Sequence, residues 1–166
     1  MQLILDNRAL IQFALMAVVC LLALRKGGGP ERGVALVLLS MFIIDRGYHL
    51  VLDRGVTLSS VDLFHAALDF AAAIALVVIA LRANRMYTLW IAGLQLIALS
   101  AHLAREMTSG MTPIAYAILY ILPSYFQILA LAVGLQMHLK RQKRYGPYRG
   151  WRRSSAGSDG LRGVRR

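Results

Sequence analysis

Cysteine and negative charge are both scarce in this sequence. The single cysteine, Cys20, lies within an apolar run, so an intramolecular disulfide and a metal site built from cysteines are excluded. Only 16% of the 166 residues are charged, and 8 Asp and Glu stand against 19 Lys and Arg. Soluble domains carry about 25% charged residues. A chain with so little charge and 58% hydrophobic residues is therefore unlike a soluble domain.

Several sequence signatures of catalysis are missing as well. No GxSxG motif occurs, and Ser100 lies about 160° around its predicted helix from His102. Gly27–Gly29 are followed by Pro30 rather than by a GK[ST] sequence, which indicates a loop and not a phosphate cradle. There is no HExxH motif and no aspartate-rich repeat for a metal diphosphate. No catalytic residue is predicted, and whether the protein is an enzyme stays open.

Long apolar runs, separated by short charged breaks, make up most of the chain. This pattern is typical of polytopic membrane proteins, in which each span needs about 20 apolar residues. We predict an all-α, polytopic transmembrane helical bundle with five spans. The spans cover residues 9–24, 33–52, 61–81, 86–104 and 113–139, within one membrane domain of residues 1–139.

The first of these spans is the shortest. A secretory signal peptide is an alternative for it, but Arg25 and Lys26 follow the apolar run and no small-x-small cleavage site is present. A signal peptide carries its positive charge before the apolar run, not after it. We interpret the segment as a retained helix, and the sequence leaves open whether it crosses the membrane fully.

The distribution of Lys and Arg predicts the orientation. The breaks at residues 25–32 and 82–85, together with residues 140–166, hold fifteen of the 19 Lys and Arg. Because cytoplasmic segments retain positive charge, we expect the N-terminus outside and the C-terminus inside. The bacterial inner, or plasma, membrane is the expected location.

Residues 140–166 form a distinct basic segment. They contain ten of the 19 Lys and Arg and little apolar sequence, so we expect a disordered cytoplasmic tail that contacts anionic lipid headgroups. Tyr145, Tyr148 and Trp151 suit a membrane interface. Aromatic residues among cations also stack on nucleic acid bases, but nucleic acid is the less favoured partner.

Four of the predicted helices carry a polar stripe near one end of the span. Residues spaced three, four, seven, eight or eleven apart share a helix face, and this spacing recurs in each run. The stripes consist of Asp45, His49 and Asp53, with Arg46 beside them; Asp62, His65 and Asp69; Gln95, His102 and Glu106, with Arg105 beside them; and Tyr116, Tyr120, Ser124 and Gln127. The first run contributes only Gln12.

Depth along each helix divides this polar layer into two levels. At 1.5 Å per residue, His49, His65 and His102 lie about 3–6 Å from the outer ends of their spans. Asp45 and Asp69 lie about 10–12 Å deep on the same scale. Ionisable side chains within a span cost about 2.5–3.5 kcal/mol each near its centre, so the stripes should face other helices. We therefore expect the three histidines to form one cluster with the aspartates beneath it.

Three functions fit such a layer, and the sequence favours the plainest. A small membrane subunit, scaffold or binding protein would use the layer as a polar network between helices, within a homo-oligomer or a larger complex. In that case Asp45 or Asp69 would pair with Arg46, and Glu106 with Arg54 or Arg105. Proton- or ion-linked transport by an oligomer is an alternative.

A bound metal ion or haem is the other alternative. His49, His65 and His102 are the candidate cofactor ligands, and Asp62 completes a metal set suited to zinc, copper or non-haem iron. Two histidines on facing helices would equally hold a haem. The remaining polar residues of the layer would then orient the ligands: Asp45, Arg46, Asp69, Gln95, Arg105, Glu106, Tyr116, Tyr120, Ser124 and Gln127.

Overall fold

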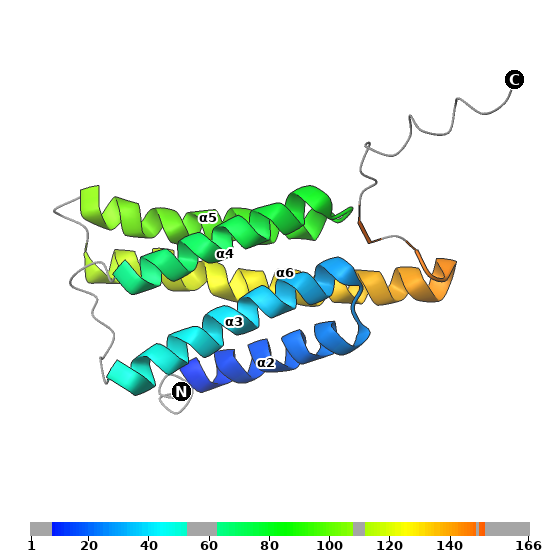
Figure 1. Cartoon of the computed structure of the whole chain (residues 1–166), viewed down its shortest axis with the longest axis horizontal. Helices are drawn as coiled ribbons and strands as arrows, with labels where there is room; N and C mark the ends of the chain where they lie inside the picture. The colour runs from blue at the N-terminus through cyan, green and yellow to red at the C-terminus, as the bar shows by residue number, and fades with distance from the viewer. Residues whose placement is uncertain (1–7, 53–62, 108–111, 149, 152–166) are drawn as a thin grey trace, which may run out of the picture.

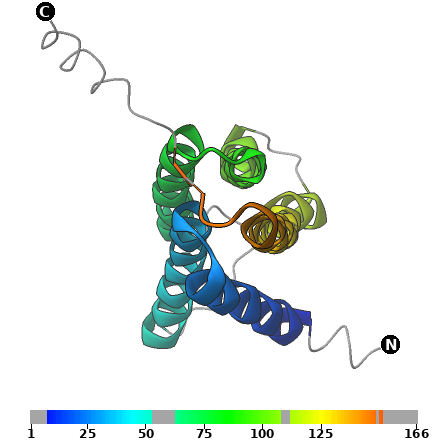
Figure 2. The ribbon, with the colours of Figure 1, turned by 90° about the vertical axis from the view of Figure 1, so that its right-hand side faces the viewer.

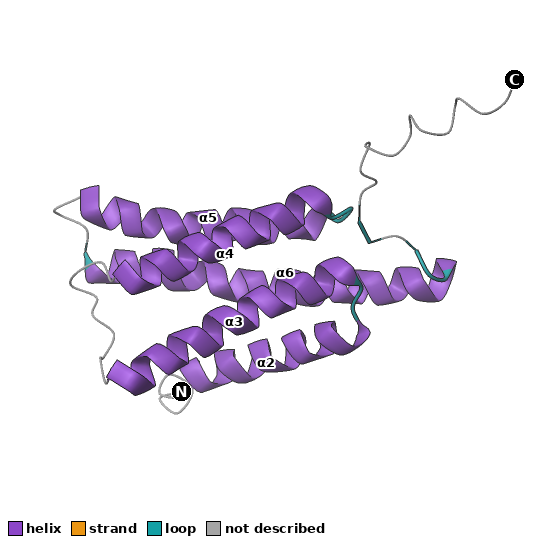
Figure 3. Ribbon diagram, in the orientation of Figure 1, coloured by secondary structure: helices purple, strands orange, loops and turns teal. Residues whose placement is uncertain are grey.

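The computed structural model describes residues 8–52, 63–107, 112–148 and 150–151. Five α-helices make up these residues almost entirely, and they lie alongside one another as a bundle (Figures 1 and 3). They are α2 Arg8–Lys26, α3 Gly29–Leu52, α4 Leu63–Arg82, α5 Met86–Met107 and α6 Pro113–Tyr145. The predicted all-helical fold is confirmed, and the described residues hold five helices.

Four of the helices, α3 to α6, are long and apolar enough to cross a membrane. Their outer surfaces are apolar too: Leu50 is 84% exposed, Leu63 81% and Trp90 70%. Large apolar side chains exposed to this extent along whole helices indicate contact with lipid rather than water. The structure thus indicates an integral membrane protein. The helix α2 is not among the four, so a fifth span and the predicted orientation stay predictions.

Contacts between neighbouring helices hold the bundle together. The long helix α6 contacts α5, α2 and α3, while α4 contacts α3 and α5. Small residues line these contacts, including the buried Ala23, Ala35, Ala80 and Ala92. Such residues let helix backbones approach closely inside a membrane. Gly134 of α6 shows how close: a Cβ placed there would lie 2.7 Å from the ring of Tyr87 on α5.

Capping residues explain where α6 begins and ends. Thr112 caps the N-terminus by accepting a hydrogen bond from the Ala115 N–H at 3.3 Å, and Pro113 occupies the first helical position, where its missing N–H is not needed. At the other end Gly146 adopts a positive φ of 73° and donates its N–H to the Gln142 carbonyl. The helix continues across Pro123.

The largest difference between the helix bounds and the predicted spans is at the end of α6. The predicted membrane domain ends at residue 139, but α6 continues to Tyr145, because backbone hydrogen bonding does not stop where the apolar sequence does. The chain then folds back, and the Asn84 N–H donates to the Gly150 carbonyl at 3.1 Å. The first part of the predicted disordered tail is therefore folded, and residues 152–166 lie outside the described residues.

Candidate functional site

A cluster of one aspartate and two histidines joins α3 to α4. Asp45 and His49 stand one turn apart on α3, and His65 comes from the first turn of α4. The Nε2 atom of His65 lies 2.9 Å from Asp45 Oδ1, and that of His49 lies 3.7 Å from the same oxygen. One potential ligand atom from each residue lies within 4.8 Å of the others. We call this group the α3–α4 site.

A stacked aromatic pair holds the α3–α4 site in place. The rings of Tyr48 on α3 and Phe64 on α4 lie 3.8 Å apart and nearly parallel, at 7°. Both rings stand edge-on to His65, at 5.7 and 5.5 Å between centroids. The pair therefore links the two helices and restricts rotation of the His65 imidazole.

A second polar cluster is buried among α4, α5 and α6. Asp69 Oδ2 is 2.9 Å from His102 Nε2, and Asp69 Oδ1 accepts a hydrogen bond from Gln95 Nε2 at 2.8 Å. Gln95 Oε1 in turn accepts from Gln127 Nε2 at 2.8 Å. All four residues are at most 5% exposed. We call this chain of contacts the Asp69 network, and it fastens three helices together.

The predicted histidine layer is thus divided between two places. His49 and His65 meet around Asp45, whereas His102 bonds to Asp69 in the network next to α6. The histidines do lie next to aspartates, but in separate groups rather than in one cluster of three. The carboxylates of Asp45 and Asp69 take histidines as partners where the network hypothesis expected Arg46.

The other predicted site residues have varied positions. Arg46 is exposed and its guanidinium lies 5.4 Å from the ring centroid of Phe42. Ser124 accepts a hydrogen bond from Gln12 of α2 at 2.7 Å, and Arg105 is half-buried on α5. Asp53, Arg54 and Asp62 lie outside the described residues, as do the side chains of Glu106, Tyr116 and Tyr120.

A third polar cluster, at the opposite end of the bundle, was not predicted. Glu31 is fully buried and accepts a hydrogen bond from Arg85 Nε at 3.3 Å. The Arg85 guanidinium lies 4.5 Å from the ring centroid of Tyr148, whose hydroxyl is 2.9 Å from Nδ1 of the buried His138. The available signal was that Glu31 is the one acidic residue in the two short basic breaks.

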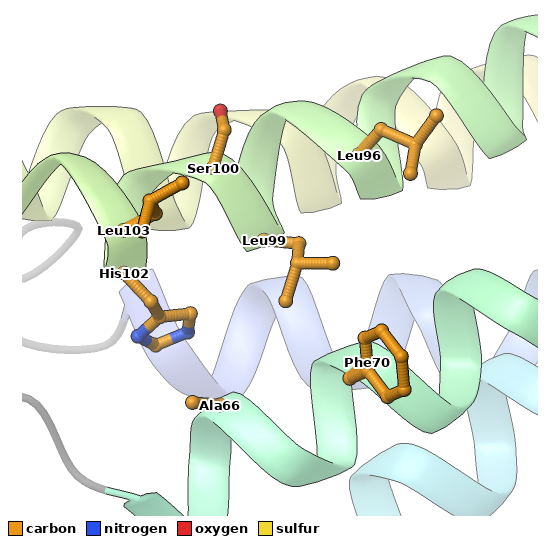
Figure 4. A pocket seen from close by; sticks show the side chains of 7 residues that line it. All are labelled: Ala66, Phe70, Leu96, Leu99, Ser100, His102 and Leu103. Atoms are coloured by element: carbon orange, nitrogen blue, oxygen red, sulfur yellow. The ribbon is translucent and has the colours of Figure 1, made fainter.

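A hollow of about 460 Å³ lies between α4 and α5. Its lining is almost wholly apolar (Figure 4): Ala66, Phe70, Leu96, Leu99, Ser100, His102 and Leu103. The Ser100 hydroxyl donates to the Ile97 carbonyl at 2.7 Å, and His102 Nε2 faces Asp69. With its polar groups engaged by the protein in this way, the hollow suits a hydrocarbon chain better than a polar ligand.

The three clusters offer different chemistry. The Asp69 network is buried and its side chains are paired with one another, which is typical of helix fastening. The third cluster, around Glu31, is centred on the buried Glu31–Arg85 pair, in which Glu31 Oε2 and Arg85 Nη2 have no hydrogen-bond partner among the described residues. In the α3–α4 site the side chains of Asp45, His49 and His65 are 32%, 20% and 14% exposed, so an ion or small ligand has access.

Comparison of the chain with models of protein families, with curated proteins and with solved structures gives no match.

Proposed function

We propose that this protein is a small integral membrane protein that binds a divalent transition-metal ion at the α3–α4 site. The observation that carries the proposal is the convergence of Asp45, His49 and His65, whose potential ligand atoms lie within 4.8 Å of one another. Two imidazoles and one carboxylate suit borderline ions such as Zn²⁺, Fe²⁺ and Cu²⁺.

The distances support this proposal. Ligands bound to one ion at about 2.0–2.2 Å stand roughly 3–3.5 Å from each other. The two Nε2 to Oδ1 distances, 2.9 and 3.7 Å, lie close to that range. An ion would therefore replace the present contacts with His49 and His65 after only small side-chain shifts.

The surroundings of the site favour an ion that keeps open coordination positions. The Tyr48–Phe64 pair orients His65 before any ion arrives, which lowers the ordering cost of binding. Three protein ligands leave coordination positions for water or a substrate, the arrangement found in catalytic rather than structural zinc sites. If the orientation predicted from Lys and Arg holds, the site faces the outside of the cell.

A haem between His49 and His65 is less favoured. Both Nε2 atoms face the same carboxylate oxygen, and the two imidazole centroids are 5.2 Å apart. A bis-histidine haem iron needs one imidazole on each side of the porphyrin plane, and Asp45 occupies the space between the two imidazoles.

Proton transport is also less favoured, because the Asp69 network ends at Gln127, whose amide donates to the Ile91 carbonyl at 3.4 Å.

A small scaffold or subunit of a larger complex is the second candidate. The buried Asp69 network favours it, because a closed set of hydrogen bonds among three helices serves assembly without any ligand. In this case the α3–α4 site would be one more fastening between helices.

Metal analysis of the detergent-purified protein separates the two candidates. After exposure to Zn²⁺, Fe²⁺ or Cu²⁺ and gel filtration, the wild type should retain about one ion per chain. His65→Ala should retain less than a tenth of that amount. His102→Gln, a histidine substitution outside the α3–α4 site, should retain the wild-type amount. A wild type without stoichiometric metal would favour the scaffold.

A further inference from the structure

We propose that one end of the bundle is a binding surface for anionic phospholipid headgroups. At this end α2 meets α3, α4 meets α5, and α6 finishes (Figure 1). We call it the basic end, because its exposed side chains include eight cations. They are Arg25, Lys26, Arg32, Arg82, Lys140, Arg141, Lys143 and Arg144.

The positive charge of the basic end is not balanced at its surface. Among the described residues, Glu31 is the one acidic residue there, and it is 0% exposed. Its carboxylate accepts a hydrogen bond from Arg85, whose side chain is 6% exposed. One buried cation thus compensates the one buried anion, and the eight exposed cations are left to attract an external anion.

A folded strap, residues 146–148 and 150–151, gathers these cations into one surface. Figure 2, which looks onto the basic end, shows the chain after α6 running back toward the end of α4. The ring of Tyr148 stacks on the guanidinium of Arg85. The backbone of Trp151 forms an isolated antiparallel β-bridge with Ala83, and its indole packs on Gly29. The strap therefore holds the end of α6 beside the other two helix junctions.

Glycines make the close approach of the strap to the helix junctions feasible. A Cβ at Gly29 would collide with the indole of Trp151, and one at Gly150 would lie 2.9 Å from Pro30 Cδ. Gly29 lies on the helix side of this contact and Gly150 on the strap side. Because both positions have room only for glycine, the strap docks in one defined way. The basic end is consequently a surface with a set shape rather than a loose cluster of charges.

Aromatic side chains place the basic end at headgroup depth. Trp151 is 42% exposed, Tyr145 is 72% exposed, and Trp90, just over one turn into α5, is 70% exposed. Trp and Tyr concentrate at the boundary between hydrocarbon and headgroups. The helix α6 has 33 residues, or about 50 Å of length, so its basic last turns extend beyond a hydrocarbon layer of about 30 Å. Lipid phosphates occupy the same level.

Lipid competition measures the proposed preference directly. The full chain in mild detergent is mixed with equal amounts of phosphatidylglycerol and phosphatidylcholine, repurified, and its retained lipid is quantified by mass spectrometry. Each cation near an anionic surface contributes about a five-fold preference, so the wild type should retain mainly phosphatidylglycerol. The preference should fall at 0.5 M salt, because salt at that concentration screens surface charge beyond roughly 4–5 Å.

Two matched variants at the end of α6 test which residues are responsible. Neutralising Lys140, Arg141, Lys143 and Arg144 to Gln should lower the ratio of the two lipids at least five-fold. Exchanging Lys for Arg and Arg for Lys at the same positions should leave it unchanged. Both variants keep residues 152–166, and all four positions are exposed, so folding should be preserved.

Three results would overturn the proposal. They are equal retention of both lipids by the wild type, an unchanged ratio after neutralisation, and tight binding of a short RNA that phosphatidylglycerol vesicles fail to displace. Metal content should be the same in both variants, because the α3–α4 site lies at the other end of the bundle. Failure of the lipid proposal is therefore distinguishable from failure of the metal proposal.

Discussion

His65 of α4 reaches across to α3 and places its Nε2 atom 2.9 Å from Oδ1 of Asp45. His49, one turn beyond Asp45, faces the same oxygen at 3.7 Å. A carboxylate shared by two imidazoles from different helices is both a fastening between helices and a potential set of metal ligands. The first predictions separate these roles.

Asp45→Asn should weaken zinc binding by about 100-fold or more, because loss of groups that merely support a ligand already reduces affinity by 10–100-fold. An amide is a weak zinc ligand compared with a carboxylate. Competition with a fluorescent zinc chelator measures the dissociation constant. Asn keeps the size of the side chain and an acceptor oxygen, so stability should change little. Unaltered zinc affinity would remove Asp45 from the site.

Zinc should stabilise the folded protein. A ligand at 100 times its dissociation constant adds about 2.7 kcal/mol to the free energy of unfolding. Thermal unfolding in detergent is followed by tryptophan fluorescence. Zinc should raise the midpoint temperature of the wild type and leave the midpoint of His65→Ala unchanged. A shift of equal size in both proteins would place the bound ion elsewhere.

Tyr48→Ala should lower zinc affinity although Tyr48 is not a proposed ligand. The substitution removes the stacked ring that orients His65 and connects α3 to α4. Aromatic pairs contribute about 0.5–1.5 kcal/mol beyond their burial, so a loss of roughly two- to thirteen-fold in affinity is expected. Tyr48→Phe keeps the ring and serves as the control, with wild-type affinity. Equal effects of Ala and Phe would point to the hydroxyl instead.

Asp69→Ala should destabilise the bundle by about 1–3 kcal/mol, because His102 and Gln95 would lose a buried partner. Asp69→Asn should cost less, since its amide oxygen can still accept one of the two hydrogen bonds. Equilibrium unfolding in a denaturing detergent gives the free energies. Zinc retention per folded chain should be unchanged in both variants. A loss of zinc would show that the Asp69 network and the α3–α4 site act together.

Gly134→Ala should destabilise the contact between α5 and α6 by about 1–3 kcal/mol, because the new methyl group would lie 2.7 Å from the Tyr87 ring. Adding Tyr87→Ala should recover part of that loss by removing the obstructing ring. The same unfolding assay tests the pair. Additive losses in the double variant would mean that the two residues do not meet in the membrane.

Local composition was enough to find the helices. A long apolar run has to satisfy its backbone hydrogen bonds within itself when lipid surrounds it, so α3 to α6 were predicted close to their observed positions. The bounds were less accurate where polar residues continue a helix, as at Tyr145. The strap was not predicted, because its contacts depend on Gly29 and Ala83, which are distant in sequence from Trp151.

The sequence also predicts the depth of each polar residue along its span, because rise along a helix is constant. Which residues meet was decided only by the tertiary structure. His49, His65 and His102 have similar predicted depths, yet His102 contacts Asp69 while the other two meet at Asp45. The reason is that α5 packs against α4 and α6. Periodicity places a side chain on a face of its own helix. Helix packing decides which helix that face contacts. Packing depends on small residues such as Gly134, and on contacts that each helix makes with several others at the same time.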